Sequence, residues 1–224
     1  MARQTTETMR LNTTAKDHAE PSKTIHLMGS SSITEYTGFW SSDSADDILR
    51  QLLSELTWRT DCINLFGKRI PIPRLQCWMG EPHCDYKYSG ISLAPMPWVP
   101  IVARIRDKIN TTSGEAFNCV LINHYRNGFD SNGWHADDEK ILGESPAIAS
   151  ASFGATRSFQ LKPKRKGTDK PSTIYLAHGS LIVMNPGFQE EWLHQIPKEK
   201  QITGARLNLT FRYIPPPLSR LEIG

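Results

Sequence analysis

The chain has 224 residues, of which 38% are hydrophobic and 22% charged, with a formal net charge of +3. This length can bury one sizeable core, and the composition is that of a globular protein. No apolar run approaches the roughly 20 residues of a membrane span, and the first ten residues lack the apolar core of a secretory signal. We therefore expect neither a membrane partner nor secretion. The four cysteines form no C-x-x-C pair, which favours free thiols in a reducing compartment.

The first 30 residues differ in composition from the rest. They are rich in Thr, Ser, Lys and Glu and poor in large apolar side chains, so they cannot bury enough surface to become ordered alone. We expect residues 1–30 to form a flexible tail. Residues 31–224 are expected to form a single domain.

Two segments have apolar residues at the spacing of a helix. One runs from Asp46 to about Trp58, and the other covers 100–109. Both are predicted to be packing helices rather than sites. The candidates for the cap of the first helix are Ser42, Asp43 and Ser44.

The segment between these helices, about 60–95, is predicted to form strands broken by glycine and proline turns. Its aromatic residues look exposed, and Lys68, Arg69 and Arg74 are interleaved with them. A half-buried hairpin whose basic residues face water would explain this pattern. A nucleic-acid surface would explain it too, because basic residues bind phosphates and aromatic rings stack on bases. The residues alone leave both interpretations open.

From Phe117 onward, short strand-like runs follow one another without a helix-length segment between them. They cover 117–125, 147–154, 157–162, 172–177, 180–185 and 206–214. This spacing predicts an antiparallel sandwich or jelly roll rather than alternating β–α units. The expected fold class is therefore mainly β with flanking helices, an α+β arrangement. A basic tract, Lys162 to Lys170, is predicted to lie in a loop between two strands.

A metal site is suggested by the triplet H-A-D at 135–137. In an extended segment, His135 and Asp137 point to the same face and can bind one divalent metal. His194 is the best candidate for a third ligand, because His124 would point away from that face and His178 is expected to hold a turn. Two histidines and one carboxylate leave three octahedral positions open, which suits non-haem Fe(II).

The last predicted strand strengthens this hypothesis. Polar and apolar residues alternate along it, so Arg206, Asn208, Thr210 and Arg212 share one face. If that face is buried, its arginines need an anionic partner. Two guanidinium groups could hold the two ends of a short dicarboxylate. Together with the metal ligands, this strand indicates an Fe(II)/2-oxoglutarate oxygenase.

Six motifs resemble the AlkB family of nucleic-acid dealkylating dioxygenases. They are N-H-Y (123–125), H-A-D-D-E (135–139), S-F-G-A-T-R-S-F (152–159), H-G-S-L-I-V-M (178–184), W-L-H-Q-I-P (192–197) and R-L-N-L-T-F-R (206–212). The branch with the nuclear DNA-repair homologues of animals is the nearest match, and the resemblance covers about 60–214 in the same order. It implies a double-stranded β-helix (jelly roll) over about 117–214, with an N-terminal nucleotide-recognition lid over about 60–95.

The resemblance also implies roles for individual residues. The implied catalytic iron ligands are His135, Asp137 and His194. Those implied to hold 2-oxoglutarate are Asn123, Tyr125, Arg206 and Arg212, with Asn208 and Thr210 on the same face. The implied substrate-binding residues are the lid residues Tyr86, Tyr88 and Ser89, the acidic residues Asp138 and Glu139, the wedge Phe66 with Gly67 and Lys68 after it, and the strand-holding Arg74.

The implied function is oxidative demethylation of 1-methyladenine and 3-methylcytosine in DNA, with RNA as a further substrate. It would use Fe(II), O2 and 2-oxoglutarate and release formaldehyde, succinate and CO2. The expected partner is alkylated DNA, double- or single-stranded, bound by a monomer. A eukaryotic source would imply the nucleus and a bacterial source the cytoplasm.

Two departures from the family pattern leave the strand preference open. Trp134 and the pair at 126–127 look like the branch that prefers single strands and RNA, whereas Phe66 favours a duplex. Three other functions are weighed against nucleic-acid dealkylation. A hydroxylase of protein or lipid would not need Phe66 or Tyr86, and a cupin-like binding module would tolerate the loss of a ligand. A zinc hydrolase would leave the arginine-bearing strand unexplained.

Overall fold

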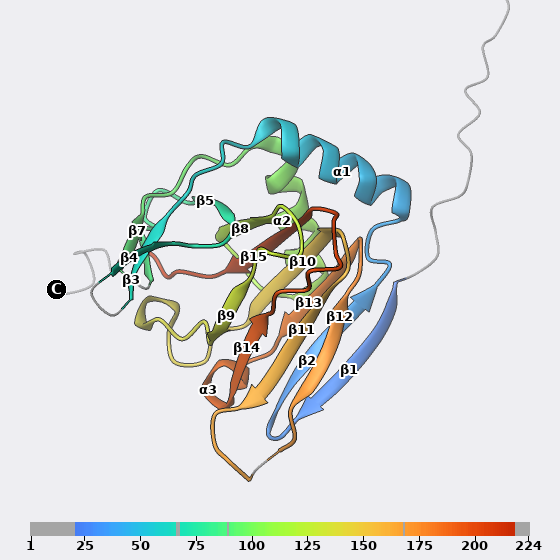
Figure 1. Ribbon diagram of the computed structural model, residues 1–224, viewed down its shortest axis with the longest axis vertical. Helices are drawn as coiled ribbons and strands as arrows, with labels where there is room; N and C mark the ends of the chain where they lie inside the picture. Colours follow the sequence, from blue (N-terminus) through green and yellow to red (C-terminus); the bar gives the residue numbers. More distant parts are fainter. Residues whose placement is uncertain (1–20, 66–67, 89, 168, 218–224) are drawn as a thin grey trace, which may run out of the picture.

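The computed structural model describes residues 21–65, 68–88, 90–167 and 169–217 (Figure 1). Two antiparallel sheets form its framework. The larger contains, in spatial order, β1 (Ser22–Met28), β2 (Ser31–Thr37), β13 (Ser180–Met184), β10 (Ile148–Gly154), β15 (Arg206–Arg212), β8 (Cys119–Tyr125) and β5 (Leu75–Gly80). The smaller contains β12 (Ser172–Leu176), β11 (Arg157–Pro163), β14 (Trp192–Ile196) and β9 (Asn132–His135). Together the two sheets form a jelly roll, as the spacing of the strands predicted.

The helices lie mainly on the outer face of the larger sheet. α1 (Ser42–Glu55) and α2 (Pro100–Ser113) pack together there (Figure 1). The remaining helical segments are short: η1 (Lys140–Leu142) and α3 (Phe188–Glu191). Among the described residues, no helix has both the length and the apolar character that crossing a membrane requires.

Both predicted helices form, with shifted ends. The side chain of Ser41 caps α1 by accepting from the Ser44 amide, so the expected cap at 42–44 was wrong by one residue. The apolar spacing extended the first prediction to Trp58, but the chain is already extended at Leu56. In contrast, α2 continues beyond 109 until Gly114, whose φ of 77° ends it.

The larger sheet separates two hydrophobic cores. Alternate residues of its strands face the helices, where Ile122 and Leu209 pack with Ile48 and Ile105. The other side chains face the smaller sheet, where Leu121 packs in one cluster with Phe159 and Leu161. Because both faces are covered, the central strands are almost entirely buried, and polar residues on the inner face need partners there.

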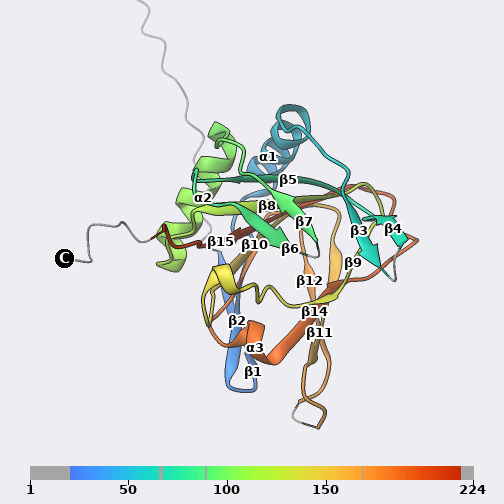
Figure 2. The ribbon, with the colours of Figure 1, turned by 90° about the vertical axis from the view of Figure 1, so that its left-hand side faces the viewer.

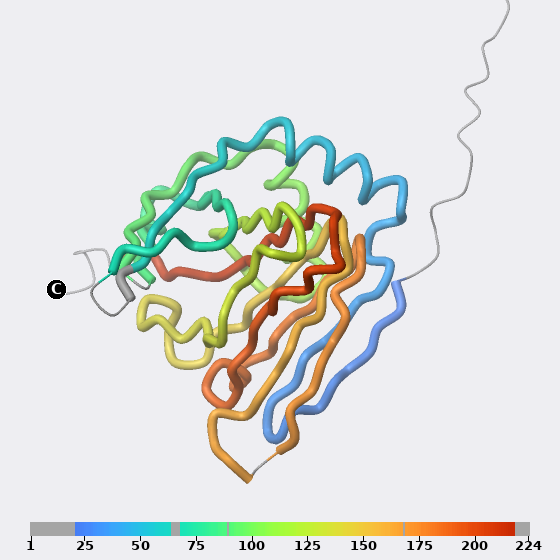
Figure 3. Tube along the Cα trace, viewed as in Figure 1, coloured from blue at the N-terminus to red at the C-terminus, as the bar shows by residue number. Residues whose placement is uncertain are grey.

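Residues 22–28 correct the prediction of a tail up to residue 30. They form β1, which pairs along its whole length with β2, and β2 in turn pairs with β13. Figure 3 shows this blue hairpin beside the orange segments of the chain. The composition gave the wrong prediction because an edge strand is held largely by backbone hydrogen bonds and needs few buried apolar side chains. Of the residues of β1, only Met28 is buried. Residues 1–20 of the predicted tail lie outside the described residues.

Two short hairpins occupy the segment in which a lid was expected. They are β3 (Cys62–Leu65) with β4 (Lys68–Pro71), and β6 (Tyr86–Tyr88) with β7 (Ile91–Leu93). In Figure 2 both hairpins face the viewer, on the same side as β9. The four cysteines are free in the described part of the chain, as the sequence predicted.

Candidate active site

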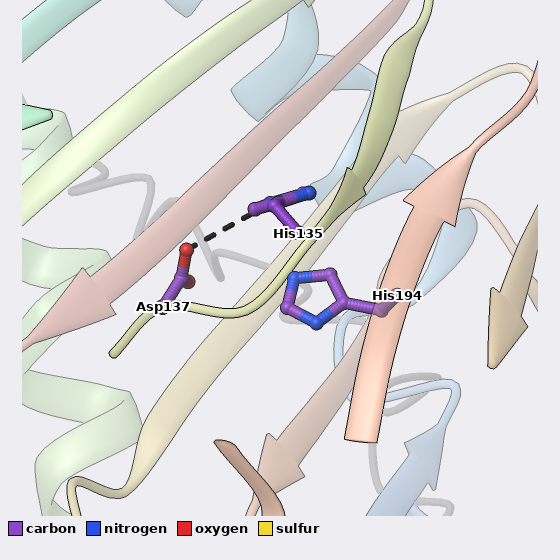
Figure 4. Close-up of side chains that lie close together, drawn as sticks. All are labelled: His135, Asp137 and His194. Atoms are coloured by element: carbon purple, nitrogen blue, oxygen red, sulfur yellow. Dashed lines mark ion pairs between the residues drawn. The ribbon is translucent and has the colours of Figure 1, made fainter. Parts of the chain in front are cut away.

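Three predicted metal ligands converge between the sheets (Figure 4). His135 is the last residue of β9 and lies directly opposite His194 of β14 in the antiparallel pair. Their ring centroids are 4.2 Å apart, and His135 Nε2 lies 3.8 Å from Asp137 Oδ1. One ligand atom from each of the three residues lies within 4.8 Å of the others. His194 thus belongs to a strand that the sequence did not predict.

The charges of this cluster suit a divalent metal. Burial acts to raise the pKa of Asp137, but Arg212 and then the two histidines hold it at about 2. Burial and the neighbouring His135 lower the pKa of His194 to about 3, and burial also lowers the pKa of His135. Neutral imidazoles and an ionised carboxylate are the forms that bind metal. The donor set therefore fits Fe(II), and the His135 side chain keeps 33% of its surface exposed.

The polar face of β15 points inward, toward this cluster. Arg206, Asn208, Thr210 and Arg212 are all buried. Asn208 Nδ2 donates to Thr210 Oγ1 at 3.0 Å, while Arg212 donates from Nη2 to Asp137 Oδ2 at 2.8 Å. Arg212 is thus hydrogen-bonded to a candidate metal ligand. Of its three side-chain nitrogens, only Nε has no hydrogen-bond partner among the described residues.

Arg206 is a buried cation whose hydrogen bonds are incomplete. It is 1% exposed, and its Nη2 donates to Ser152 and Asn208. Its Nε and Nη1 find no hydrogen-bond partner in the described residues, and burial lowers its pKa to about 10. Tyr125 lies under it, with the ring centroid 5.3 Å from Cζ. Unpaired buried donors are costly, and a carboxylate of 2-oxoglutarate would satisfy them.

β8 supplies the remaining predicted 2-oxoglutarate residues. Tyr125 lies opposite Arg206 and Asn123 opposite Asn208 in the register of β8 with β15. The Asn123 Oδ1 accepts from Arg74 Nε at 2.7 Å and from Gln76 Nε2 at 3.1 Å. The sequence placed Arg74 on an exposed basic surface, but its side chain is buried in the site.

A pocket of about 240 Å³ joins these residues to the lid segment. All three candidate metal ligands line it, together with Asn123, Tyr125, Asn208, Thr210 and Arg212 of β8 and β15 and with Tyr86, Tyr88, Arg74 and Glu139 from other segments. Arg206 is not among the lining residues, and it contacts the site through Asn208 and Tyr125. The structure thus brings together most of the residues that the sequence predicted to form the site.

The lid aromatics are more buried than the sequence suggested. Tyr86 stacks on Trp78 with ring centroids 4.7 Å apart, and Arg212 Cζ lies 5.5 Å from the Tyr86 centroid. Tyr88 donates its hydroxyl to Gln76 Oε1. Gln76 was not predicted as a site residue, although a glutamine within the otherwise apolar strand 75–80 was a signal that could have identified it.

The two predicted acidic residues point in different directions. Glu139 lines the pocket, and burial followed by the charge of Asp137 raises its pKa. Asp138 does not line the pocket; it pairs with Lys164 at 2.8 Å, and its side chain is 58% exposed. Lys68 is exposed on β4. Phe66, Gly67 and Ser89 lie outside the described residues.

The comparisons with known proteins agree with this geometry. Residues 32–212 match the model of the 2OG-Fe(II) oxygenase superfamily. The chain is 38% identical over 200 residues to mouse DNA oxidative demethylase ALKBH2, covering 85% of this chain and 84% of that protein. It is 39% identical over 200 residues to human alpha-ketoglutarate-dependent dioxygenase alkB homolog 3, covering 84% of this chain and 68% of that protein.

A solved structure supports the fold independently. The structure of OsALKBH1 superposes with a TM-score of 0.57 at 19% sequence identity, covering 84% of this chain and 99% of that one. At this identity the similarity speaks for the fold alone, which is the mainly β architecture described above. The family match and the sequence identities carry the assignment: the chain belongs to the 2OG-Fe(II) oxygenase superfamily and, within it, to the AlkB family of Fe(II)- and 2-oxoglutarate-dependent dioxygenases.

Proposed function

We propose that this protein is an oxidative demethylase that repairs alkylated DNA by removing N-linked methyl groups from bases such as 1-methyladenine and 3-methylcytosine. The mouse relative that shares 38% of the aligned residues is named a DNA oxidative demethylase. The observation that carries the proposal is that the metal cluster, two tyrosines and a carboxylate line the same pocket. A hydroxylase of protein side chains would not need this aromatic and acidic end.

In this proposal, the chain holds the reactants as follows. His135, Asp137 and His194 bind Fe(II), and Arg206 receives a carboxylate of 2-oxoglutarate beside Tyr125. The bound metal, 2-oxoglutarate and O2 together supply the oxidation that hydroxylates the methyl group, whose loss as formaldehyde leaves the intact base, with succinate and CO2 as further products. Because Arg212 fixes one oxygen of Asp137, the other oxygen is left to face the metal.

The lid end of the pocket would hold the damaged base. The methylated nitrogen lies on the pairing edge, so the nucleotide must leave the stack to reach the metal. Tyr86 and Tyr88 provide aromatic surface for the flipped base, with Glu139 beside them. Both proposed lesions carry a positive charge, which a nearby carboxylate favours over a neutral base.

RNA is a second proposed substrate class, because one observation favours the binding of single-stranded nucleic acid, which includes RNA as well as DNA. Trp134 is partly exposed next to the metal ligand His135, and Lys162 Nζ lies 4.3 Å from its ring centroid. An exposed aromatic ring next to a cation can hold an unpaired strand. We further propose that the protein acts as a monomer, in the nucleus if its source is eukaryotic and in the cytoplasm if it is bacterial.

The experiment is the mass loss of one methyl group from oligonucleotides that contain 3-methylcytosine. Matched single-stranded DNA, duplex DNA and single-stranded RNA would be incubated with Fe(II), 2-oxoglutarate and ascorbate, with His135→Ala as the inactive control. We expect demethylation of DNA, and Phe66→Ala should reduce it only on the duplex if Phe66 acts as a wedge. No mass loss on any strand, with succinate still forming, would overturn the proposed substrate.

A further inference from the structure

Asp137 lies in a part of the chain that no sheet holds. β9 ends at His135, and residues 136–139 have no regular secondary structure. The two histidines are positioned by the pairing of β9 with β14, but the backbone of Asp137 lies beyond that ladder. Its carboxylate is fixed by Arg212, which constrains the side chain and leaves the main chain to be held by something else.

The partner of that main chain is the side chain of Gln189. Gln189 Oε1 accepts from the Asp137 backbone N–H at 2.9 Å, across 52 positions of sequence. Gln189 is 1% exposed, and its Nε2 donates to Met184 Sδ at 3.3 Å. A thioether sulfur can only accept, so this contact sets the orientation of the amide and aims its oxygen at Asp137. The amide group is used on both sides, as a buried polar group requires.

The position of Gln189 links two ligand segments. It lies in α3, the short helix that directly precedes β14, and five residues before His194. The segment that carries His135 and Asp137 is therefore joined to the segment that carries His194 at two points. One is the β9–β14 pairing, and the other is the Gln189 hydrogen bond.

We infer that Gln189 is a positioning residue of the metal centre, which holds the Asp137 backbone so that its carboxylate meets the same ion as the two histidines. The hydrogen bonds of Gln189 go to the Asp137 backbone and to Met184, and the pocket lining includes Met184 but not Gln189 itself. Groups that orient metal ligands in this way commonly change metal affinity by about 10- to 100-fold when they are removed. The inference rests on the proposed metal centre.

The test compares two glutamine-to-methionine variants by their binding of Co(II), with Fe(II) binding as a second measurement. Gln189→Met keeps the size of the side chain but leaves the buried Asp137 N–H without an acceptor. Gln195→Met is the matched control, because Gln195 directly follows His194 in β14, so its side chain points to the opposite face of the strand, where it pairs with Gln160 at 2.7 Å. The ligand-field absorption of Co(II), its dissociation constant and the melting temperature of the metal-free protein would be recorded for each.

We expect Gln189→Met to bind Co(II) about 10- to 100-fold more weakly, with an altered absorption spectrum, while Gln195→Met matches wild type. The inference would be overturned if Gln189→Met bound Co(II) with wild-type affinity and spectrum, whatever its melting temperature. It would also be overturned if both variants lost affinity equally in proportion to a lower melting temperature. Failure of the wild-type protein to bind Co(II) or Fe(II) would instead contradict the proposed metal centre.

Discussion

The two ends of the pocket are built in different ways. At one end, β8 and β15 are interior strands of a seven-stranded sheet, and their polar site residues are buried. At the other end, Tyr86 and Tyr88 lie on a hairpin of two three-residue strands outside that sheet. The first end has a fixed framework, because β15 pairs with both β10 and β8, and β8 pairs with both β15 and β5. The second end depends on a few side-chain contacts.

This contrast separates two tasks. The reaction with 2-oxoglutarate needs donors that are held in place before the reactants arrive, which central strands provide. Substrate choice can change with the short hairpins while the sheet stays the same, as is common for elements attached to a rigid scaffold. Changes at the sheet end should therefore impair turnover of every methylated base alike, whereas changes at the lid end should alter which base is demethylated.

The largest expected effect is at the metal cluster. His135→Ala should reduce both succinate and formaldehyde to background, because a two-residue set no longer holds Fe(II) in the pocket. The two products would be quantified in the same reaction. His83→Ala is the control, since His83 bonds to the Ile214 carbonyl away from the cluster. Retention of succinate formation in His135→Ala would contradict the ligand assignment.

The next effect concerns Arg206. Replacing one member of a buried charge pair costs about 2–5 kcal/mol, so Arg206→Met should raise the KM for 2-oxoglutarate by about 30-fold or more. The melting temperature of the metal-free protein should not fall, because an apolar side chain removes a poorly satisfied buried cation. Arg104→Met, at an exposed position of α2, is the control. An unchanged KM for 2-oxoglutarate in Arg206→Met would rule out its role.

A smaller effect is expected at the lid end. Glu139→Gln should lower kcat/KM about 10-fold for 3-methylcytosine, because a hydrogen bond or contact with a charged group is worth about 1.5–3 kcal/mol. The same variant should change little for 3-methyluracil, which has nearly the same shape but no charge. Asp138→Asn is the matched control, since Asp138 faces Lys164 outside the pocket. Equal losses of kcat/KM on both bases would show that Glu139 does not distinguish a charged base from a neutral one.

The smallest effect is on stability. The pKa of His194 is about 3 in the folded protein and near 6.5 in the unfolded chain. The unfolded chain therefore binds the proton more readily, and the free energy of unfolding of the metal-free protein should fall as pH drops below 6.5. His194 alone should contribute about 1 kcal/mol between pH 6.5 and 5.5. Urea unfolding of wild type and His194→Leu measures this, and identical pH profiles would contradict it.

The sequence predicted the sheet end better than the lid end, for a physical reason. Alternation along 206–212 determines which residues share a face, and once the fold buries that face, Arg206 must lie inside. Comparison with the other histidines then left His194 as the best candidate for the third ligand, although β14 itself was not predicted. Its short apolar pattern follows α3 without a turn signal, so nothing in the local sequence marks it as a strand.

Other features depend on contacts that no local pattern encodes. Arg74 looked like a surface cation, but Asn123 and the Ser131 carbonyl hold it inside the pocket. Asp138 and Glu139 are adjacent and chemically similar, and only the path of the chain after Asp137 decides which of them enters the pocket. Gln189 has no motif at all, because its role follows from a hydrogen bond to a backbone 52 residues away.

The most direct test of the proposed demethylase function measures succinate and formaldehyde together in the wild-type protein. One reaction would contain an oligonucleotide with 3-methylcytosine, and its control would contain the same sequence with cytosine. We predict equimolar formaldehyde and succinate with the methylated strand, and slow succinate formation without formaldehyde with the control. If succinate formed at the same rate with both strands and no formaldehyde appeared, the metal end of the pocket would be active but its lid end would not bind methylated bases.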